Sequence, residues 1–423
     1  MKQQNSHYRW AVLAVCFMMV FVCLGFCSSN KSLYLGAITE ALQIKRSLFS
    51  INDSFRYVTS ALTNLFFAAL IGRFGVRRMV GFGFLSLIGS MLLYATSSHI
   101  LLFYLGGILL GVGLTFTTNS IASYLIKHWF TANIGRYLGI VFAANGVGGA
   151  VAAQIITPII YNGEPFGYRR SYLLVAAILT VVGIIAVVVL KNPPDVAPAP
   201  AAKKARGGSW RGPELAELKH KPWFYLVLVM VFLTGFILQS ISGTWAAHVK
   251  DVGFDAGFVA TVLSVSSLVL TVSKIIVGLV YDHFGLRPTL LLCQCSTIIA
   301  FVSMLFLTVN ATGKVLATVF AVFFSLALPL ETVVIPLIVN GLFGSASYDK
   351  CLGYLLAANY AGYACGTPMV NLCYDMTGSY NPAFFAFAIL MLLCAVTFFI
   401  VIGIAQKNKR RMMEEADATE AGA

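Results

Sequence analysis

Two side chains of opposite charge lie deep inside long apolar segments of the sequence. Lys274 follows the run Leu268–Ser273, about two turns from the end of its segment, and Glu331 lies mid-segment between Leu330 and Thr332. An ionisable group in hydrocarbon is costly and normally faces a polar cavity. One interpretation is a buried ion pair that joins two helices. The other, which we favour, is that Lys274 binds a carboxylate anion while Glu331 takes up a proton or is the resting partner of the lysine.

Three further charges lie near the predicted outer ends of the first two apolar segments. Lys31 is expected near the outer end of the first segment, as an interfacial lysine or as a cation that attracts anions at the outer mouth. Arg56 follows Asp53 by one helical turn, and this spacing favours a local ion pair.

Amide side chains add hydrogen-bonding groups to several apolar segments. Asn119 stands in one of them, and Asn145 and Asn359 occupy corresponding places in two others. Each alone could bridge two helices, but together they predict a polar binding site. Gly146 and its neighbouring glycines more readily permit close helix packing than phosphate binding.

The elements that must position these side chains are membrane-spanning helices. A bilayer core needs about 20 apolar residues for each helix. Twelve candidate spans lie near residues 10–37, 48–71, 79–97, 101–125, 138–161, 171–190, 223–249, 258–281, 288–309, 315–341, 352–374 and 383–405. We therefore predict an N-terminal six-helix half (1–190), a cytoplasmic linker (191–221), a C-terminal six-helix half (222–405) and a cytoplasmic tail (406–423). The linker should hold a short helix around Pro213 to Lys219.

Composition and charge distribution agree with a membrane protein. Of the 423 residues, 59% are hydrophobic and only 11% are charged, whereas soluble domains carry roughly 25% charged residues. With both termini in the cytoplasm, most of the 29 Lys and Arg residues fall on the inner side. The net charge of +13 then reflects topology and contact with anionic lipid, and a nucleic-acid partner is not expected. The spacing of Cys and His predicts no metal site and no cofactor.

The two halves repeat each other. Phe74-Gly75-Val76-Arg77 follows the second span, and Phe284-Gly285-Leu286-Arg287 follows the eighth. A second match, Leu-Gly-x-x-x-Ala-Ala-Asn, occurs at 138–145 and at 352–359. Two matches in register indicate duplicated six-helix halves, which we expect to be related by an axis along the membrane normal with a site between them.

The repeated turn resembles the loop signature of the major facilitator superfamily, with Gly75, Arg77, Asp282, Gly285 and Arg287 at the signature positions. The first copy has Gly72 where the family usually has Asp. The resemblance covers the whole chain. It implies an all-α membrane fold of twelve transmembrane helices in two six-helix pseudo-symmetric halves, and a gating role for the loop motif.

Within that superfamily the chain is similar to the monocarboxylate transporter and oxalate:formate antiporter group. Gly25-Phe26 followed by Lys31-Ser32 resembles the first-helix segment of monocarboxylate transporters. By the same resemblance, Lys274 stands where the group carries a carboxylate-binding arginine, and Asn359 stands where oxalate:formate antiporters carry a second cation. A singly charged substrate is therefore better supported than oxalate.

The sequence thus predicts a non-enzymatic secondary transporter of a small organic anion, most simply a monocarboxylate, that works by alternating access with proton symport. The predicted substrate-binding residues are Lys274, Lys31, Asn119, Asn359 and Asn145, with Glu331 for proton coupling. Alternatives are an anion exchanger, a proton-coupled amino-acid or multidrug transporter, and, more distantly, a membrane sensor. We expect a monomer in the cell inner membrane, with a carboxylate, protons and membrane lipid as its partners.

Overall fold

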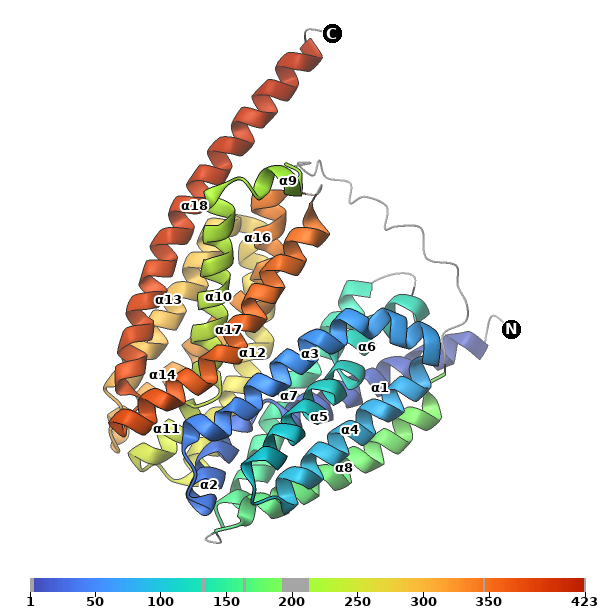
Figure 1. Cartoon of the computed structure of the whole chain (residues 1–423), viewed down its shortest axis with the longest axis vertical. Coiled ribbons are helices and arrows are strands. Elements are labelled where there is room, and N and C mark those ends of the chain that lie inside the picture. Colours follow the sequence, from blue (N-terminus) through green and yellow to red (C-terminus); the bar gives the residue numbers. More distant parts are fainter. Residues whose placement is uncertain (1–3, 131–133, 163–164, 192–212, 345–346, 422–423) are drawn as a thin grey trace.

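The computed structural model describes residues 4–130, 134–162, 165–191, 213–344 and 347–421, and the regular secondary structure in this part of the chain is entirely helical (Figure 1). Most of the predicted linker, residues 192–212, lies outside the described residues. Its end forms the short helix α9 (Leu215–Leu218), which confirms the predicted linker helix.

The helices of the first half pack mainly on one another. They are α1 (Gln4–Cys27), α2 (Lys31–Leu42), α3 (Arg46–Phe74), α4 (Val76–Thr96), α5 (Ile100–Thr117), α6 (Asn119–Trp129), α7 (Ile134–Ile160) and α8 (Gly167–Val189).

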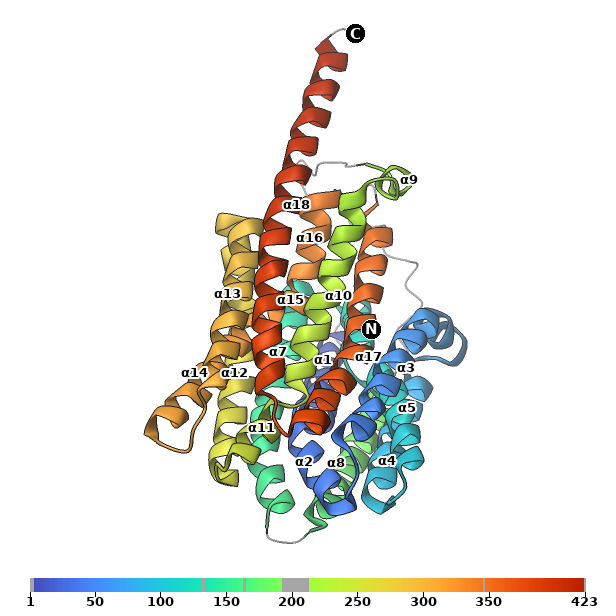
Figure 2. The same cartoon turned by 60° about the vertical axis from the view of Figure 1, so that its left-hand side comes forward.

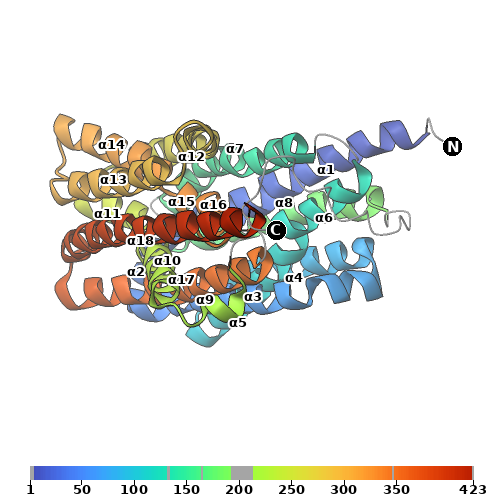
Figure 3. The ribbon, with the colours of Figure 1, turned by 90° about the horizontal axis from the view of Figure 1, so that it is seen from above.

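The second half forms a similar group. Its helices are α10 (Pro222–Ser242), α11 (Trp245–Val252), α12 (Ala256–Phe284), α13 (Leu286–Leu305), α14 (Ala311–Ala327), α15 (Pro329–Thr332), α16 (Val334–Phe343), α17 (Tyr348–Thr377) and α18 (Asn381–Ala421). Figure 3 shows the two groups side by side.

The predicted spans correspond to these helices. Within the described residues, ten helical segments are long and apolar enough to cross a membrane. The two remaining predicted spans are α3 and α17, of 29 and 30 residues, which are long enough to cross but carry more polar side chains. These two helices pack against each other between the halves, and some of their polar residues, such as Arg56 and Asn371, are buried there. The fold is therefore all-α, with twelve crossing segments in two groups of six.

The repeated turn has the same backbone conformation in both halves. Gly75 ends α3 and begins α4 with φ 80°, and Gly285 ends α12 and begins α13 with φ 78°. Glycine adopts positive φ without the steric cost that a Cβ imposes. This agreement supports the duplication inferred from the sequence.

Four of the spans are interrupted rather than continuous. The first breaks between α1 and α2, the fourth at Thr118 between α5 and α6, the seventh between α10 and α11, and the tenth around α15. An interrupted span is tolerated inside a membrane only where its backbone meets protein or a polar cavity. The breaks therefore mark where the molecule holds polar groups.

The two halves diverge toward one end of the molecule, which we call the open end. It carries both termini and α9, and α18 extends beyond the bundle there as one helix that runs on through the predicted tail (Figures 1 and 2). At the opposite end, the closed end, α2 and α11 lie together and the halves meet.

Candidate functional site

A cavity of about 270 Å³ lies between the halves, where the interrupted spans break. Its wall comes from both groups of helices. The polar residues that line it are Ser28, Ser29, Lys31, Arg56, Tyr57, Asn119, Asn145, Gln239, Ser242, Ser266, Ser267, Lys274, Glu331, Thr332 and Tyr363. Cavities for drug-sized ligands start at roughly 300 Å³, so this volume suits a small solute.

Most of the predicted site residues meet in this cavity. Lys31, Asn119 and Asn145 line it from the first half, and Lys274 and Glu331 from the second. Side chains that are 300 residues apart in the sequence therefore share one space, as the predicted duplication requires.

Asn359 lies elsewhere. Its side chain is buried at the interface of α17 and α10, where a Cβ on Gly235 would clash with its side-chain oxygen. Both amide atoms lack a hydrogen-bond partner among the described residues. The structure does not place Asn359 in the cavity lining, so the match to Asn145 at the sequence level does not extend to the site.

Lys31 is deeper than predicted, and the expected position near the outer end of its span is wrong. After the break at 28–30 the chain resumes as α2, which begins at Lys31 and continues to Leu42. Lys31 therefore lies beside the cavity rather than at the end of the span, because the helix that it begins continues toward the closed end for 12 residues.

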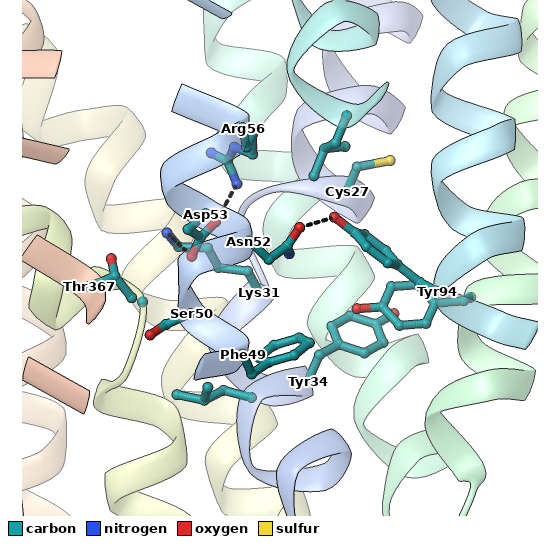
Figure 4. A pocket seen from close by; sticks show the side chains of 14 residues that line it. Cys27, Lys31, Tyr34, Phe49, Ser50, Asn52, Asp53, Arg56, Tyr94 and Thr367 are labelled. Atoms are coloured by element: carbon teal, nitrogen blue, oxygen red, sulfur yellow. Dashed lines mark hydrogen bonds and ion pairs between the residues drawn. The ribbon is translucent and has the colours of Figure 1, made fainter. Parts of the chain in front are cut away.

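Asp53 holds two cations at once, as Figure 4 shows. Its Oδ2 lies 3.0 Å from Lys31 Nζ, and its Oδ1 lies 3.4 Å from Arg56 Nη1. Arg56 also donates to Ser28 Oγ at 3.1 Å and to Tyr57 Oη at 3.0 Å. The predicted Asp53–Arg56 pair is confirmed, whereas the addition of Lys31 was not foreseen. We call Lys31, Asp53 and Arg56 the triad; its formal charge is +1.

Lys274 and Glu331 share the cavity without pairing. Among the described residues the ion pairs within 4.0 Å are Lys31–Asp53, Arg56–Asp53 and Arg46–Asp251, so Lys274 has no carboxylate partner there. Glu331 is 7% exposed, and its Oε1 has no hydrogen-bond partner in the described part of the chain. The purely structural interpretation, a direct Lys274–Glu331 pair, is absent from this conformation of the described residues.

Three helices that follow a break in an interrupted span also begin at the cavity. Lys31, Asn119 and Trp245 are the first residues of α2, α6 and α11, and each lines the cavity. In the described residues none of these three ends carries a side-chain cap. Helix N-termini are partially positive and present backbone N–H groups. With Lys274 and the triad, these ends give the site a positive character that suits an anion.

At the closed end, five residues join the halves in a group that we call the latch: Arg46, Asp251, Tyr374, Asp375 and Tyr380. Arg46 of α3 forms an ion pair with Asp251 of α11, with Nη2 2.8 Å from Oδ1. Its guanidinium lies 4.0 Å from the centre of the Tyr374 ring and donates to Tyr380 Oη at 3.1 Å. Asp375 accepts from the backbone N–H groups of Arg46 and Ser47 at 3.1 and 2.9 Å, so one half caps a helix of the other.

The halves also touch along α7 and α12. A Cβ on Gly146 would clash with Thr271 Oγ1 and with the Ser267 carbonyl, and Gln154 donates to Ser264 Oγ at 3.0 Å. The predicted role of Gly146 in close helix packing is confirmed, and the packing joins the two halves.

The loop-motif residues lie at the open end. Gly75 and Gly285 form the turns described above, and Asp282 is exposed. The Arg287 guanidinium lies 5.0 Å from the centre of the Phe399 ring, so it contacts the last span of its own half. The structure thus assigns these residues a position, and their predicted gating role remains a hypothesis.

Sequence reasoning missed the latch and the two tyrosines of the cavity. Arg46, Asp251 and Asp375 are ordinary loop-flanking charges in the sequence, and a pairing across 205 or 329 positions leaves no local pattern. Tyr57 and Tyr363 lie in spans where aromatic residues are common. Tyr57 accepts from Lys31 Nζ at 3.3 Å and also receives a hydrogen bond from Gln239 of the other half.

Comparison with known proteins agrees with this geometry. The family model described as the Major Facilitator Superfamily matches residues 13–346 and 250–418. A Bacillus subtilis relative, the uncharacterized MFS-type transporter YcxA, is 26% identical over 68% of this chain and 68% of its own length. Multidrug resistance protein 2 of the same organism is 23% identical over 58% of this chain and 61% of its own. Monocarboxylate transporter 13 of Bos taurus is 26% identical over 75% of this chain and 71% of its own.

A solved structure, that of the nucleoside transporter NupG, aligns with a TM-score of 0.75 at 13% identity and covers 92% of this chain and 98% of its own. At that identity the similarity supports the fold alone. The family match spans most of the chain and includes both repeated turns. The chain therefore belongs to the Major Facilitator Superfamily and is a multi-pass membrane protein of that transporter family.

Proposed function

We propose that this protein transports a small organic monocarboxylate across the membrane by alternating access, with proton symport. The observation that carries the proposal is Lys274, a lysine that faces the central cavity with no carboxylate partner among the described residues. A cation inside the membrane-spanning region without a counter-ion favours a ligand that brings a negative charge. The half-helix N-termini around it add to the same preference.

Glu331 is the proposed proton site. It lines the same cavity and has a buried oxygen with no hydrogen-bond partner in the described residues. When the anion binds near Lys274, a proton on Glu331 keeps the total charge of the cavity low. That coupling of anion and proton is what symport requires. Lys31, Asn119 and Asn145 complete the proposed anion site, whereas Asn359 is left out because it lies outside the cavity lining.

The proposed orientation places both termini, the linker and the open end in the cytoplasm. The loop arginines Arg73, Arg77, Arg78 and Arg287 lie at the open end, as expected for cytoplasmic loops. In this orientation the structure represents an inward-open state that the latch holds closed on the outside. Transport then moves the two proposed halves, 1–190 and 222–405, against each other around the cavity. We propose that the unit is a monomer in the cell inner membrane, since a single chain supplies the complete cavity.

Uptake into proteoliposomes tests this function. Labelled formate, lactate, oxalate, a neutral amino acid and a lipophilic cation are each supplied with and without an inward proton gradient. We expect gradient-driven uptake of a monocarboxylate, abolished in Lys274→Gln and preserved in Lys274→Arg. The matched control is Lys314→Gln, which removes the same charge from an exposed site outside the cavity.

Three results would redirect the proposal. Uptake that needs a counter-anion inside the vesicle but no proton gradient indicates an exchanger. Uptake of the lipophilic cation alone indicates a multidrug transporter. Full monocarboxylate uptake by Lys274→Gln would show that Lys274 does not bind the carboxylate.

A further inference from the structure

A groove of about 850 Å³ lies at the open end, outside the central cavity, beside the turn that joins α3 to α4. Its polar part consists of Arg73, Arg77 and Arg78. Its apolar part consists of Phe74 at the end of α3, Phe82 and Leu85 on α4, and Val187 on α8. The Arg73 guanidinium lies 5.4 Å from the centre of the Phe74 ring. None of these side chains belongs to the proposed substrate site.

The polar part is strongly basic. Arg73 and Arg78 are exposed, and among the described residues that line the groove none is acidic. The corresponding turn of the second half differs, because it carries the exposed carboxylate of Asp282 and a single arginine, Arg287. At the position that matches Asp282, the first half has Gly72, which lines the groove and has open space around it. The first turn thus has more cations than the second and lacks its carboxylate.

The apolar part continues from the arginines along two helices. Phe82 is 51% exposed and Leu85 is 70% exposed, and both line the groove together with Val187 of α8. The ring of Phe82 also makes an edge contact with Phe116 of α5. Gly81 lies between these side chains, and a Cβ there would make an ordinary van der Waals contact of 3.4 Å with a methyl of Val187. One end of the groove is therefore cationic and the rest is an apolar channel on the lipid-facing side of the bundle.

We propose that this groove binds an anionic phospholipid. The phosphate and headgroup contact Arg73 and Arg78, with Arg77 alongside, and an acyl chain lies along Phe82, Leu85 and Val187. A soluble anion would use the arginines but has no group for the apolar wall, whereas a phospholipid matches both parts. In the proposed orientation the lipid comes from the cytoplasmic leaflet, where anionic lipids attract basic segments. Lipid binding itself does not depend on which solute the protein transports.

The experiment measures lipid binding to the purified full-length protein by native mass spectrometry and by thermal unfolding in detergent. Phosphatidylglycerol, phosphatidylcholine with the same acyl chains, and soluble glycerol phosphate are titrated separately. For the unaltered protein we expect retention of phosphatidylglycerol and a higher Tm with that lipid alone. For Arg73→Gln/Arg78→Gln we expect about 30-fold weaker binding, from the usual contribution of two basic residues at a lipid surface.

A second variant, Gly72→Asp, tests the same site without removing a cation. It restores the carboxylate that the second half has as Asp282, at a position where nothing lies within 4 Å of an added Cβ. We expect it to fold and to lose the preference for phosphatidylglycerol over phosphatidylcholine. The control Lys45→Gln/Lys314→Gln removes two exposed charges away from the groove and should bind as the unaltered protein does.

Two outcomes would overturn the inference. If Arg73→Gln/Arg78→Gln and Gly72→Asp both keep the phosphatidylglycerol preference, the lipid binds elsewhere. If glycerol phosphate raises the Tm as much as phosphatidylglycerol does, the groove binds a soluble anion.

Discussion

Arg46 and Asp251 form an ion pair that connects the two halves of the molecule, with Nη2 of the arginine 2.8 Å from Oδ1 of the aspartate. They lie 205 residues apart in the sequence and belong to α3 and α11. The pair is partly exposed, with side-chain exposures of 11% and 28%. It is the central contact of the latch, so its loss should affect the balance between conformations more than the stability of either half.

Asp251→Asn should weaken the closed end. Removing one partner of a partly buried charge pair costs about 1–2 kcal/mol at such exposure, which is roughly a tenfold change in a conformational equilibrium. Spin labels at Arg73 and Lys350, exposed positions at the open end of each half, report the distance between the halves. We expect a new population at shorter distance. Asp255→Asn is the matched control, because Asp255 caps its own helix α12 and asparagine can keep that cap. An unchanged distance distribution in Asp251→Asn would show that the latch does not control opening.

Glu331→Gln separates proton coupling from substrate binding. Glutamine keeps the size of the side chain but cannot carry the charge that a proton neutralises. We expect proton-driven accumulation to be lost, and uptake to lose its dependence on pH, while exchange of labelled for unlabelled substrate continues. The measurement compares net uptake and exchange in the same proteoliposomes between pH 5.5 and 8. If net uptake in the variant still follows the proton gradient, another group carries the proton.

Asp53→Asn leaves Lys31 and Arg56 without their shared carboxylate. Breaking a buried charge pair by removing one partner costs about 3–5 kcal/mol, and here two cations lose the same partner. We expect a lower Tm and a higher affinity for anions at the cavity, because the triad changes from a formal charge of +1 to +2. Asp53→Glu keeps the charge and should restore part of the Tm. Equal Tm values for Asp53→Asn and the unaltered protein would contradict a stabilising triad.

Gly146→Ala tests the contact between α7 and α12. The added methyl group would clash with Thr271 Oγ1 and with the Ser267 carbonyl of the other half, so we expect transport to fall at least tenfold. Gly139→Ala is the control on the same helix, since its Cβ would meet nothing within 4 Å. Alanine also favours the helix by about 1 kcal/mol over glycine at an exposed site, so this control should be stable and active. Similar transport by both variants would show that transport does not depend on the close contact at Gly146.

The sequence predicts the spans and the repeat well, because hydropathy and motif spacing are local properties. It predicts which charges are unusual, since Lys274 and Glu331 stand out in apolar surroundings, and the structure places both in one cavity. The depth of Lys31 was not predictable in the same way. A break such as the one before α2 does not change the apolar composition of the span, so it leaves no signal in the hydropathy. It does change the depth at which each residue lies in the membrane.

Contacts between the halves were beyond sequence reasoning. Asp375 caps α3 from a distance of 329 residues, and no periodicity relates it to Arg46. Asn359 is a case in which a sequence pattern was present but misleading. Its motif matches that of Asn145, yet the two halves place the motif differently, because Asn359 packs on Gly235 whereas Asn145 accepts a hydrogen bond from Ser29 Oγ at 2.9 Å beside the cavity. Pseudo-symmetry in sequence therefore does not imply equivalent chemistry.

The interrupted helices have a consequence for how the protein responds to pH. The partial positive charge at the start of α2, α6 and α11 belongs to peptide groups, which neither gain nor lose protons in the physiological range. Attraction of an anion by these ends stays constant as the medium acidifies. In the proposed mechanism, the response of transport to acid therefore comes from ionisable side chains of the cavity such as Glu331, and not from these helix ends.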